Sequence, residues 1–487
     1  MKAMRCEPRT LAVIVLVLMA GCRGEETLPG RSRPLLKHDW PHPRDYRFGP
    51  SEFKAPDPAG ARVETPSGLR AYLLRSDADP VVRVSAALPL GRLRERAGEA
   101  GASGLLTEIL TRRGPADPAR PLSLRLESLG SKLSVEEDLD LTRISLEVLD
   151  EDWREGLGLM VDLLRRPDLE QGFIRGYRTG PGYSEPTSGL AVSGFRPRVE
   201  LERLLLGYPL APPEGGLTVN GKAVRDLASR SLGANRVVLG IGGNLPRAEV
   251  EAALIDLSRG WPAAEEEAAL VKLPEEKPQP GPLHTRDVPA LVGWIAMGRT
   301  IGPVPESDRA PLAVMASVYN TRLNIAIREM RGLANRALLT IPNTASGAGL
   351  LSIATGGRPE SVAPLIKFSL EEAVRMGALS DRITPEELER AKGALILGTW
   401  QAGLDGVREA STTFAAETVR YGGVERLLKW PDAVQAVSAE QVKDAAQKYL
   451  KPAEMTKVIL GPMEKIRRAR HPRWPVALDE LSPGKTS

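Results

Sequence analysis

The segment "LESLGSKLSVEEDLDLTRISLEVLDEDWREGLGLMVDLLRRPDL", residues 126–169, decides the fold class of this chain. A helical pattern stops at Gly130, and the alternation of apolar and polar residues from Thr142 to Val148 predicts a strand. From Trp153 onward the apolar residues recur at helical spacing, which predicts an amphipathic helix. Such an order, with short turns, predicts an α+β fold in which helices pack on an antiparallel sheet.

The plan occurs twice along the chain. The segment "TVNGKAVRDLASRSLGANRVVLGIGG" (218–243) resembles "AVSAEQVKDAAQKYLKPAEMTKVILGP" (436–462), and each runs from a polar helix start to a short strand that ends in glycine. The repeat predicts two homologous halves. Within the first copy, we interpret "GIGGN" (240–244) as a turn. We place an N-terminal domain at residues 59–267, a proline-rich linker at 268–286, a C-terminal domain at 287–466 and a tail at 467–487.

Composition sets limits on the partners. The 487 residues exceed what one hydrophobic core usually serves, and 42% hydrophobic with 26% charged residues is ordinary for globular domains. The net charge of +4 is a small excess spread over a long chain. A nucleic acid is therefore not expected as a partner.

The N-terminus carries the strongest localisation signal. Lys2 and Arg5 precede an apolar run at residues 11–19, and Ala20-Gly21-Cys22 follows it. Residues 1–21 therefore predict a secretory signal peptide, and the small residues next to Cys22 resemble a bacterial lipoprotein signal, in which Cys22 is lipidated. A plain signal peptide or a membrane anchor are the alternatives. Residues 22–58 predict a proline-rich tether.

We therefore expect a protein of the cell envelope, anchored to the membrane through lipid only. Because Arg23, not aspartate, follows Cys22, we expect the anchor in the outer membrane, facing the periplasm.

Several phrases, in this order, resemble the insulinase/pitrilysin family of zinc metallopeptidases. They are "SGLRAYLL" (67–74), the segment quoted above, "TRLNIAIREMRGLANRA" (321–337) and "ITPEELERAKGALI" (383–396). The resemblance implies two α+β halves that form a clam-like chamber around an extended peptide. In two-subunit members, one chain carries the zinc while the other helps to enclose the peptide.

The zinc motif of the family is incomplete in this chain. Active members carry His-x-x-Glu-His on their first helix, where two histidines four residues apart share a zinc ion and the glutamate activates its water. The helix "GASGLLTEILTRRG" (101–114) keeps Glu108 but has Leu105 and Ile109 at the histidine positions. These two belong to an apolar stripe with core spacing. We expect no metal, no cofactor and no catalytic residue, and treat Glu108 as a relic.

Other donors are scarce or badly placed. The four histidines are His38, His42, His284 and His471, in segments predicted as tether, linker and tail. Glu185 lies near the distance expected for the third zinc ligand of the family, but the surrounding "TGPGYSEP" would break a helix.

The resemblance also implies a substrate-contacting arginine followed four residues later by tyrosine. Here Arg331 is present, and Asn335 stands at the tyrosine position. We name both as candidate substrate-binding residues. The alternative is that Arg331 caps the end of its helix just before Gly332.

These observations predict an inactive homologue of a zinc metalloendopeptidase, a lipoprotein subunit that binds extended peptides together with a catalytic homologue. Two alternatives stay open: an active zinc metalloendopeptidase with a displaced metal site, and an envelope peptide-binding scaffold that has no peptidase partner.

Overall fold

The structure is a computed structural model. It describes residues 53–78, 80–116, 120–170, 178–179, 195–207, 217–267, 269–271, 273, 281–378 and 382–481. Residues from Phe53 onward belong to one compact unit. The predicted signal peptide, Cys22 and nearly all of the tether lie outside the described residues. Among the described helices, none combines the length and hydrophobicity that a bilayer span requires.

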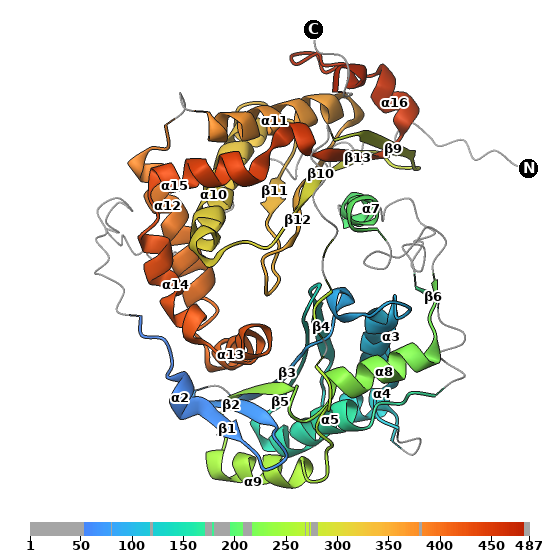
Figure 1. The fold of residues 1–487 in the computed structure, drawn as a ribbon, viewed down its shortest axis with the longest axis vertical. Coiled ribbons are helices and arrows are strands. Elements are labelled where there is room, and N and C mark those ends of the chain that lie inside the picture. Colours follow the sequence, from blue (N-terminus) through green and yellow to red (C-terminus); the bar gives the residue numbers. More distant parts are fainter. Residues whose placement is uncertain are drawn as a thin grey trace, which may run out of the picture. The chain divides into compact units, whose positions relative to one another are not determined.

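The strands form two large sheets (Figure 1) and one small pair. The first sheet has the order β1-β2-β8-β3-β5-β4, with β1 (Arg62–Glu64), β2 (Arg70–Arg75), β3 (Val81–Leu88), β4 (Leu133–Glu137), β5 (Thr142–Leu149) and β8 (Val238–Gly243). The second has the order β11-β12-β10-β13-β9, with β9 (Leu283–Asp287), β10 (Gly293–Ile301), β11 (Ala337–Thr340), β12 (Gly349–Gly357) and β13 (Thr456–Gly461). The small pair is β6 (Arg178–Thr179) with β7 (Leu217–Thr218).

The two sheets share one topology. Read in reverse, the second order places β9, β13, β10, β12 and β11 at the positions of β2, β8, β3, β5 and β4. The pairs β2–β8 and β13–β9 are parallel, and all other neighbours are antiparallel. The predicted α+β class is confirmed, but the expectation of purely antiparallel sheets was wrong by one pair in each. The last strand of each half follows a helix and lies parallel to an early strand of the same half, β8 beside β2 and β13 beside β9.

Helices cover both sheets. Those of the first half are α2 (Pro58–Ala61), α3 (Ala102–Glu108), α4 (Leu122–Ser128), α5 (Trp153–Arg165), α7 (Phe195–Leu206), α8 (Gly221–Ser231) and α9 (Arg247–Leu257). Those of the second half are α10 (Glu306–Asn324), α11 (Val362–Gly377), α12 (Pro385–Leu395), α13 (Val407–Tyr421), α14 (Glu425–Gln435), α15 (Ala439–Ala445) and α16 (Met463–Arg468). A π-helical turn, Ile109–Arg113, continues α3.

Each sheet packs on the helices of its own half through one face and takes a helix from the other half on its opposite face (Figure 1). Helix α13 lies on β2, β3 and β8 of the first sheet, where Phe414 packs against Tyr72 with ring centroids 5.4 Å apart. Helix α7 lies on β10 and β13 of the second sheet, with Leu201 buried among Val458 and Leu460. The two sheets are therefore buried on both faces along their central strands.

The glycines of β8 make the approach of α13 possible. A Cβ atom at Gly240 would lie 2.3 Å from the carbonyl oxygen of Ser411, and one at Gly242 would lie 2.3 Å from that of Val407. The helix backbone thus rests directly on the strand. The interpretation of "GIGGN" as a turn was wrong for residues 240–243, because these glycines lie inside the strand and leave room for a helix.

Two predicted boundaries also differ from the structure. Strand β9 occupies Leu283–Asp287, most of which was assigned to the linker at 268–286, and it pairs with β13. The segment assigned as a tail, 467–487, contributes the buried Val476 and Leu478 to the second core, and its Trp474 packs on Phe368. Hydrogen bonding to a strand and burial of a few large side chains outweigh the local proline and charge content.

The packing of α13 on β8 can be tested with a glycine substitution. Gly242→Ala forces the strand and helix apart, so we expect the free energy of unfolding to fall by about 1–3 kcal/mol, measured by urea denaturation. The matched control is Gly158→Ala in α5, where a Cβ meets no atom within 4 Å. It should leave the stability unchanged or raise it by about 0.5–1 kcal/mol. Equal losses in both variants would contradict direct helix-on-strand packing.

Candidate functional site

Helix α3 occupies the place of the metal-site helix implied by the sequence, and it is a core element. The five residues of its predicted apolar stripe are all 0% exposed: Ala102, Leu105, Leu106, Ile109 and Leu110. They pack in the first hydrophobic core with strands and helices of the same half. The two positions that would carry histidine side chains are therefore occupied by the buried apolar residues Leu105 and Ile109.

A buried carboxylate fixes the start of this helix. Glu95 accepts hydrogen bonds from the backbone N–H of Gly101 at 3.0 Å and of Ser103 at 2.8 Å, and from the Ser103 hydroxyl at 2.5 Å. Burial raises the pKa of Glu95, and these three hydrogen bonds oppose the rise. The carboxylate satisfies N–H groups that a helix start leaves without a partner.

Glu108 lies at the edge of the stripe. Its side chain is 24% exposed and forms an i,i+4 ion pair with Arg112 at 3.3 Å. A half-exposed pair of this kind contributes a few tenths of a kcal/mol. The contact belongs to the surface of a helix.

Zinc, which the resemblance implies for active members, does not fit these residues. Leu105 and Ile109 offer no donor atom, and a lone carboxylate is a poor zinc site. Within the described ranges, no three His, Cys, Asp or Glu side chains gather in a way suited to a metal ion. Glu185, His38 and His42 lie outside the described residues.

The two candidate substrate-binding residues, Arg331 and Asn335, have no contact partner in common among the residues that the structure describes. Arg331 donates a hydrogen bond from Nη1 to the carbonyl oxygen of Ala326 at 2.8 Å. Its guanidinium carbon lies 4.0 Å from the ring centroid of Phe368 and 5.0 Å from that of Trp474. Asn335 is exposed in a bend before β11. These contacts favour the helix-end alternative for Arg331, and substrate binding by the pair stays a prediction.

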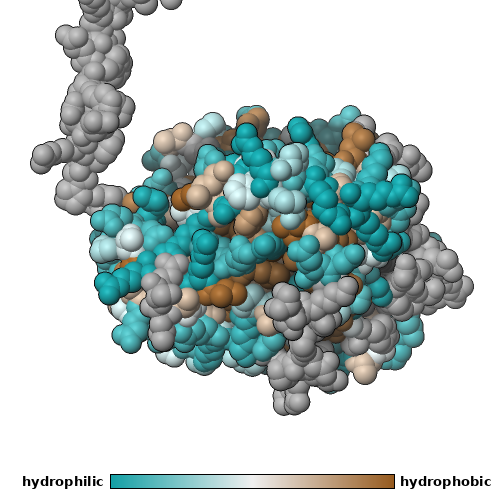
Figure 2. All heavy atoms as spheres, turned by 90° about the horizontal axis from the view of Figure 1, so that it is seen from above, coloured by the Kyte–Doolittle hydropathy of each residue, from teal (hydrophilic) through white to brown (hydrophobic). Residues whose placement is uncertain are grey.

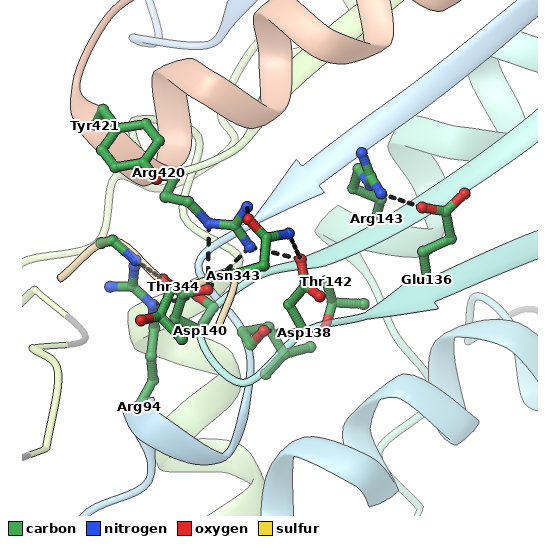
Figure 3. A network of polar contacts seen from close by, with 12 residues as sticks. Arg94, Glu136, Asp138, Asp140, Thr142, Arg143, Asn343, Thr344, Arg420 and Tyr421 are labelled. Atoms are coloured by element: carbon green, nitrogen blue, oxygen red, sulfur yellow. Dashed lines mark hydrogen bonds and ion pairs between the residues drawn. The ribbon is translucent and has the colours of Figure 1, made fainter. Parts of the chain in front are cut away.

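A polar network joins the two halves (Figure 3). Arg420, at the end of α13, donates from Nη2 to Asp138 at 2.6 Å and to Asp140 at 3.0 Å, both in the turn between β4 and β5. Asp140 is 0% exposed and also accepts from the backbone N–H of Ala345 at 2.6 Å. The backbone carbonyl of Asp140 accepts from Arg94 at 2.7 Å.

Burial lowers the pKa of Arg420, but the neighbouring charge of Asp140 and the hydrogen bond to Asp138 outweigh it, and the pKa lies above its usual range. The guanidinium therefore stays charged. Removing one partner of such a buried network would leave an uncompensated charge, which is strongly destabilising.

The edge strands of the two sheets differ in a feature that was not predicted from the sequence. On α10, Asn320 donates to the carbonyl of Leu339 at 3.0 Å and accepts from its N–H at 2.6 Å. Asn324 pairs in the same way with Ala337, at 2.8 and 3.0 Å. The i,i+4 spacing places both amides on one helix face, so they close the outer edge of β11. The Asn-x-x-x-Asn spacing was the available signal.

Strand β4, the counterpart of β11, has no strand partner on its outer edge within the part of the chain that the structure describes. Its residues are exposed except for the half-buried Leu133. Among the described residues, no side-chain amide pairs with its backbone as Asn320 and Asn324 do with β11. An open edge presents N–H and C=O groups that readily accept another extended chain.

We expect the same substitution at Glu95 and at Glu108 to have different effects on the free energy of unfolding. Glu95→Ala leaves buried N–H groups without a partner, and we expect the free energy of unfolding to fall by about 1–3 kcal/mol. Glu108→Ala removes only a surface ion pair and should change the free energy of unfolding by less than about 0.5 kcal/mol. Thermal or urea unfolding measures both. A larger loss for Glu108→Ala than for Glu95→Ala would show that the role of Glu108 has been misjudged.

Comparison with known proteins places this fold. Residues 218–395 match the family model of the peptidase M16 inactive domain. The crystal structure of a peptidase M16 inactive domain from Pseudomonas fluorescens is similar, with a TM-score of 0.67 and 18% identity over 84% of this chain and 98% of that one.

Two further structures share the fold. A protease from Helicobacter pylori has a TM-score of 0.61 and 14% identity, over 82% of this chain and 99% of that one. A chain of Complex III2 from Candida albicans has a TM-score of 0.61 and 15% identity, over 83% of this chain and 96% of that one. No curated protein matches the sequence. Residues 218–395 therefore match the peptidase M16 inactive domain, the twofold-repeated α+β fold resembles that of the M16 inactive-domain structure, and both histidine positions of α3 carry buried apolar residues.

Proposed function

We propose that this chain is a non-catalytic subunit that binds extended peptides and leaves bond cleavage to a catalytic zinc-peptidase homologue. The observation that carries the proposal is the open edge of β4, in a molecule that closes the corresponding edge of β11 with two asparagines. An extended peptide that adds to such an edge gains main-chain hydrogen bonds, whatever its sequence.

The surroundings of β4 support this role. Its C-terminal end runs into the turn in which Asp138 and Asp140 bind Arg420, so this end of the strand is held in place (Figure 3). Glu136 is paired with Arg143 on the neighbouring β5. A rigid edge costs less ordering on binding than a mobile one.

The surface of the molecule also has an apolar band. On one face of the molecule, hydrophobic residues gather in a band across the middle, with hydrophilic residues on both sides (Figure 2). Peptide side chains that alternate along an extended strand need apolar contacts for affinity beyond their backbone bonds.

A catalytic partner is proposed because the chain offers no group for cleavage at the α3 position. Leu105 and Ile109 exclude a zinc site there, and Glu108 is held by Arg112. One of the similar structures is a chain of Complex III2, a multi-subunit assembly. A lipid on Cys22 would hold the subunit at the outer membrane, facing the periplasm, with residues 22–58 as its tether.

If a peptide pairs with β4, the effect of N-methylation on its affinity should alternate from one peptide residue to the next. We expect a bound, labelled peptide of about ten residues, selected from a random library, to lose affinity at least about tenfold when alternate residues are N-methylated, because strand residues direct their N–H groups to alternate sides. N-methylation at the intervening residues should change the affinity little. Fluorescence anisotropy measures both series. Uniform losses along the peptide would rule out strand addition.

The partner can be tested by reconstitution. We expect this chain to co-purify with an M16 homologue that has an intact His-x-x-Glu-His motif, and to raise its peptide turnover by at least about tenfold, equivalent to about 1.4 kcal/mol. Replacement of the motif glutamate by glutamine in the partner should abolish turnover, whereas Glu108→Gln in this chain should not. Peptide binding without any associating homologue would support the scaffold alternative. Stoichiometric zinc on this chain alone, lost in Glu108→Gln, would support the displaced-site alternative.

A further inference from the structure

A cavity of about 520 Å³ lies in the second half, between α10, α13, α14 and the loop that joins β11 to β12. This volume is within the range of small-molecule sites. Its apolar lining includes Leu312, Ile341, Trp400 and Trp430. Its polar lining includes Arg309, Glu417, Tyr421 and Arg426.

Arg309 and Arg426, the two arginines of the polar lining, are already bound to other groups of the protein. Both bind the carboxylate of Glu306, Arg309 at 3.1 Å and Arg426 at 3.0 Å. Arg309 also donates to the carbonyl of Ala345 at 2.5 Å, and the guanidinium carbon of Arg426 lies 4.2 Å from the ring centroid of Tyr421. Together with the carboxyl groups of Glu306 and Glu417, the two guanidiniums form a polar cluster.

Glu417 is the carboxylate of this cluster that is left for a ligand. Among the described residues, its carboxyl oxygens form no hydrogen bond or ion pair, in contrast to those of Glu306. Burial raises the pKa of Glu417, and the charges of Arg426, Arg420, Arg309 and Arg143 oppose the rise. A carboxyl group withdrawn from water gains free energy when a donor reaches it.

The rim of the cavity is held in place by the network between the halves. Asn343 and Thr344 line the cavity. Asn343 donates to Asp138 at 3.1 Å, and Thr344 donates from its hydroxyl to the carbonyl of Ala348 at 2.7 Å. The next residue, Ala345, donates its N–H to Asp140. The cavity is therefore preformed, which lowers the entropy lost on binding.

We propose that this cavity binds a phenol group, with the ring against Trp400 and Trp430 and the hydroxyl on Glu417. Flat aromatic walls favour an aromatic ring. A hydroxyl can donate to an ionised carboxylate and can accept from a protonated one, so it pairs with Glu417 in either state. An ammonium group would meet the guanidiniums, and a carboxylate would meet Glu417.

The test compares two probes that differ by one hydroxyl, N-acetyl-L-tyrosinamide and N-acetyl-L-phenylalaninamide. Equilibrium dialysis of the mature full chain should show about tenfold tighter binding of the tyrosine derivative, because its hydroxyl reaches a charged acceptor. Glu417→Leu should remove this preference, and Trp430→Ala should weaken the binding of both probes. A third probe, 4-ethylphenol, identifies the source of the group: tighter binding of N-acetyl-L-tyrosinamide indicates a peptide residue, and equal binding indicates a free phenol.

The matched control is Glu425→Leu, the same change at an exposed glutamate on α14 that does not line the cavity. It should keep the preference for the tyrosine derivative. Equal binding of the two amides to the unchanged protein, or a preference that survives in Glu417→Leu, overturns the proposal. Should Glu417→Leu fail to fold, Glu417→Gln must reduce the preference, and an unchanged preference overturns it. The cavity does not include β4, so a failure here leaves the peptide site of the proposed function untouched.

Discussion

The contact on which the rest of this structure depends is that of helix α13 with strand β8. Gly240 and Gly242 bring the strand backbone within reach of the helix backbone, and Phe414 and Tyr72 seal the contact beside them. Helix α7 makes the reciprocal crossing onto the second sheet. Because each sheet buries one face with a helix of the other half, the hydrophobic surface of neither half is complete alone. This exchange explains why the described residues from Phe53 onward form one compact unit.

The position of α13 also determines both polar features of the molecule. The first turns of the helix rest on the first sheet, and its last turn carries Glu417, Arg420 and Tyr421. Arg420 reaches Asp138 and Asp140 of the first half, and its two neighbours on the helix line the cavity of the second. A displacement of the helix would therefore disturb the joint between the halves and the cavity together. The buried Asp140 makes such a displacement costly, because its carboxylate would lose its ion pair with Arg420.

Much of the fold follows from local pattern. Strand β5 and the burial of the α3 stripe lie where alternation and helical spacing place them. The repeated segments 218–243 and 436–462 contain β8 and β13, which occupy the same place in their sheets. The predictions that differ concern segments whose partners are distant in the chain. Strand β9 forms within a proline-rich stretch because β13 offers it a parallel partner, and the glycines of β8 serve a helix about 170 positions later in the chain.

The sequence by itself determined that the His-x-x-Glu-His motif is incomplete at α3, because the presence or absence of a histidine needs no knowledge of distance. It also determined the α+β class, since burial periodicity is local. Only the tertiary structure decided which edge strand is open, where the cavity lies, and that Arg331 is engaged with Ala326, Phe368 and Trp474. These features depend on pairs of groups brought together by long-range packing. Hydrogen bonds and buried charges act over a few ångströms. The periodicity of the sequence indicates which residues are buried, but it does not indicate which groups they contact.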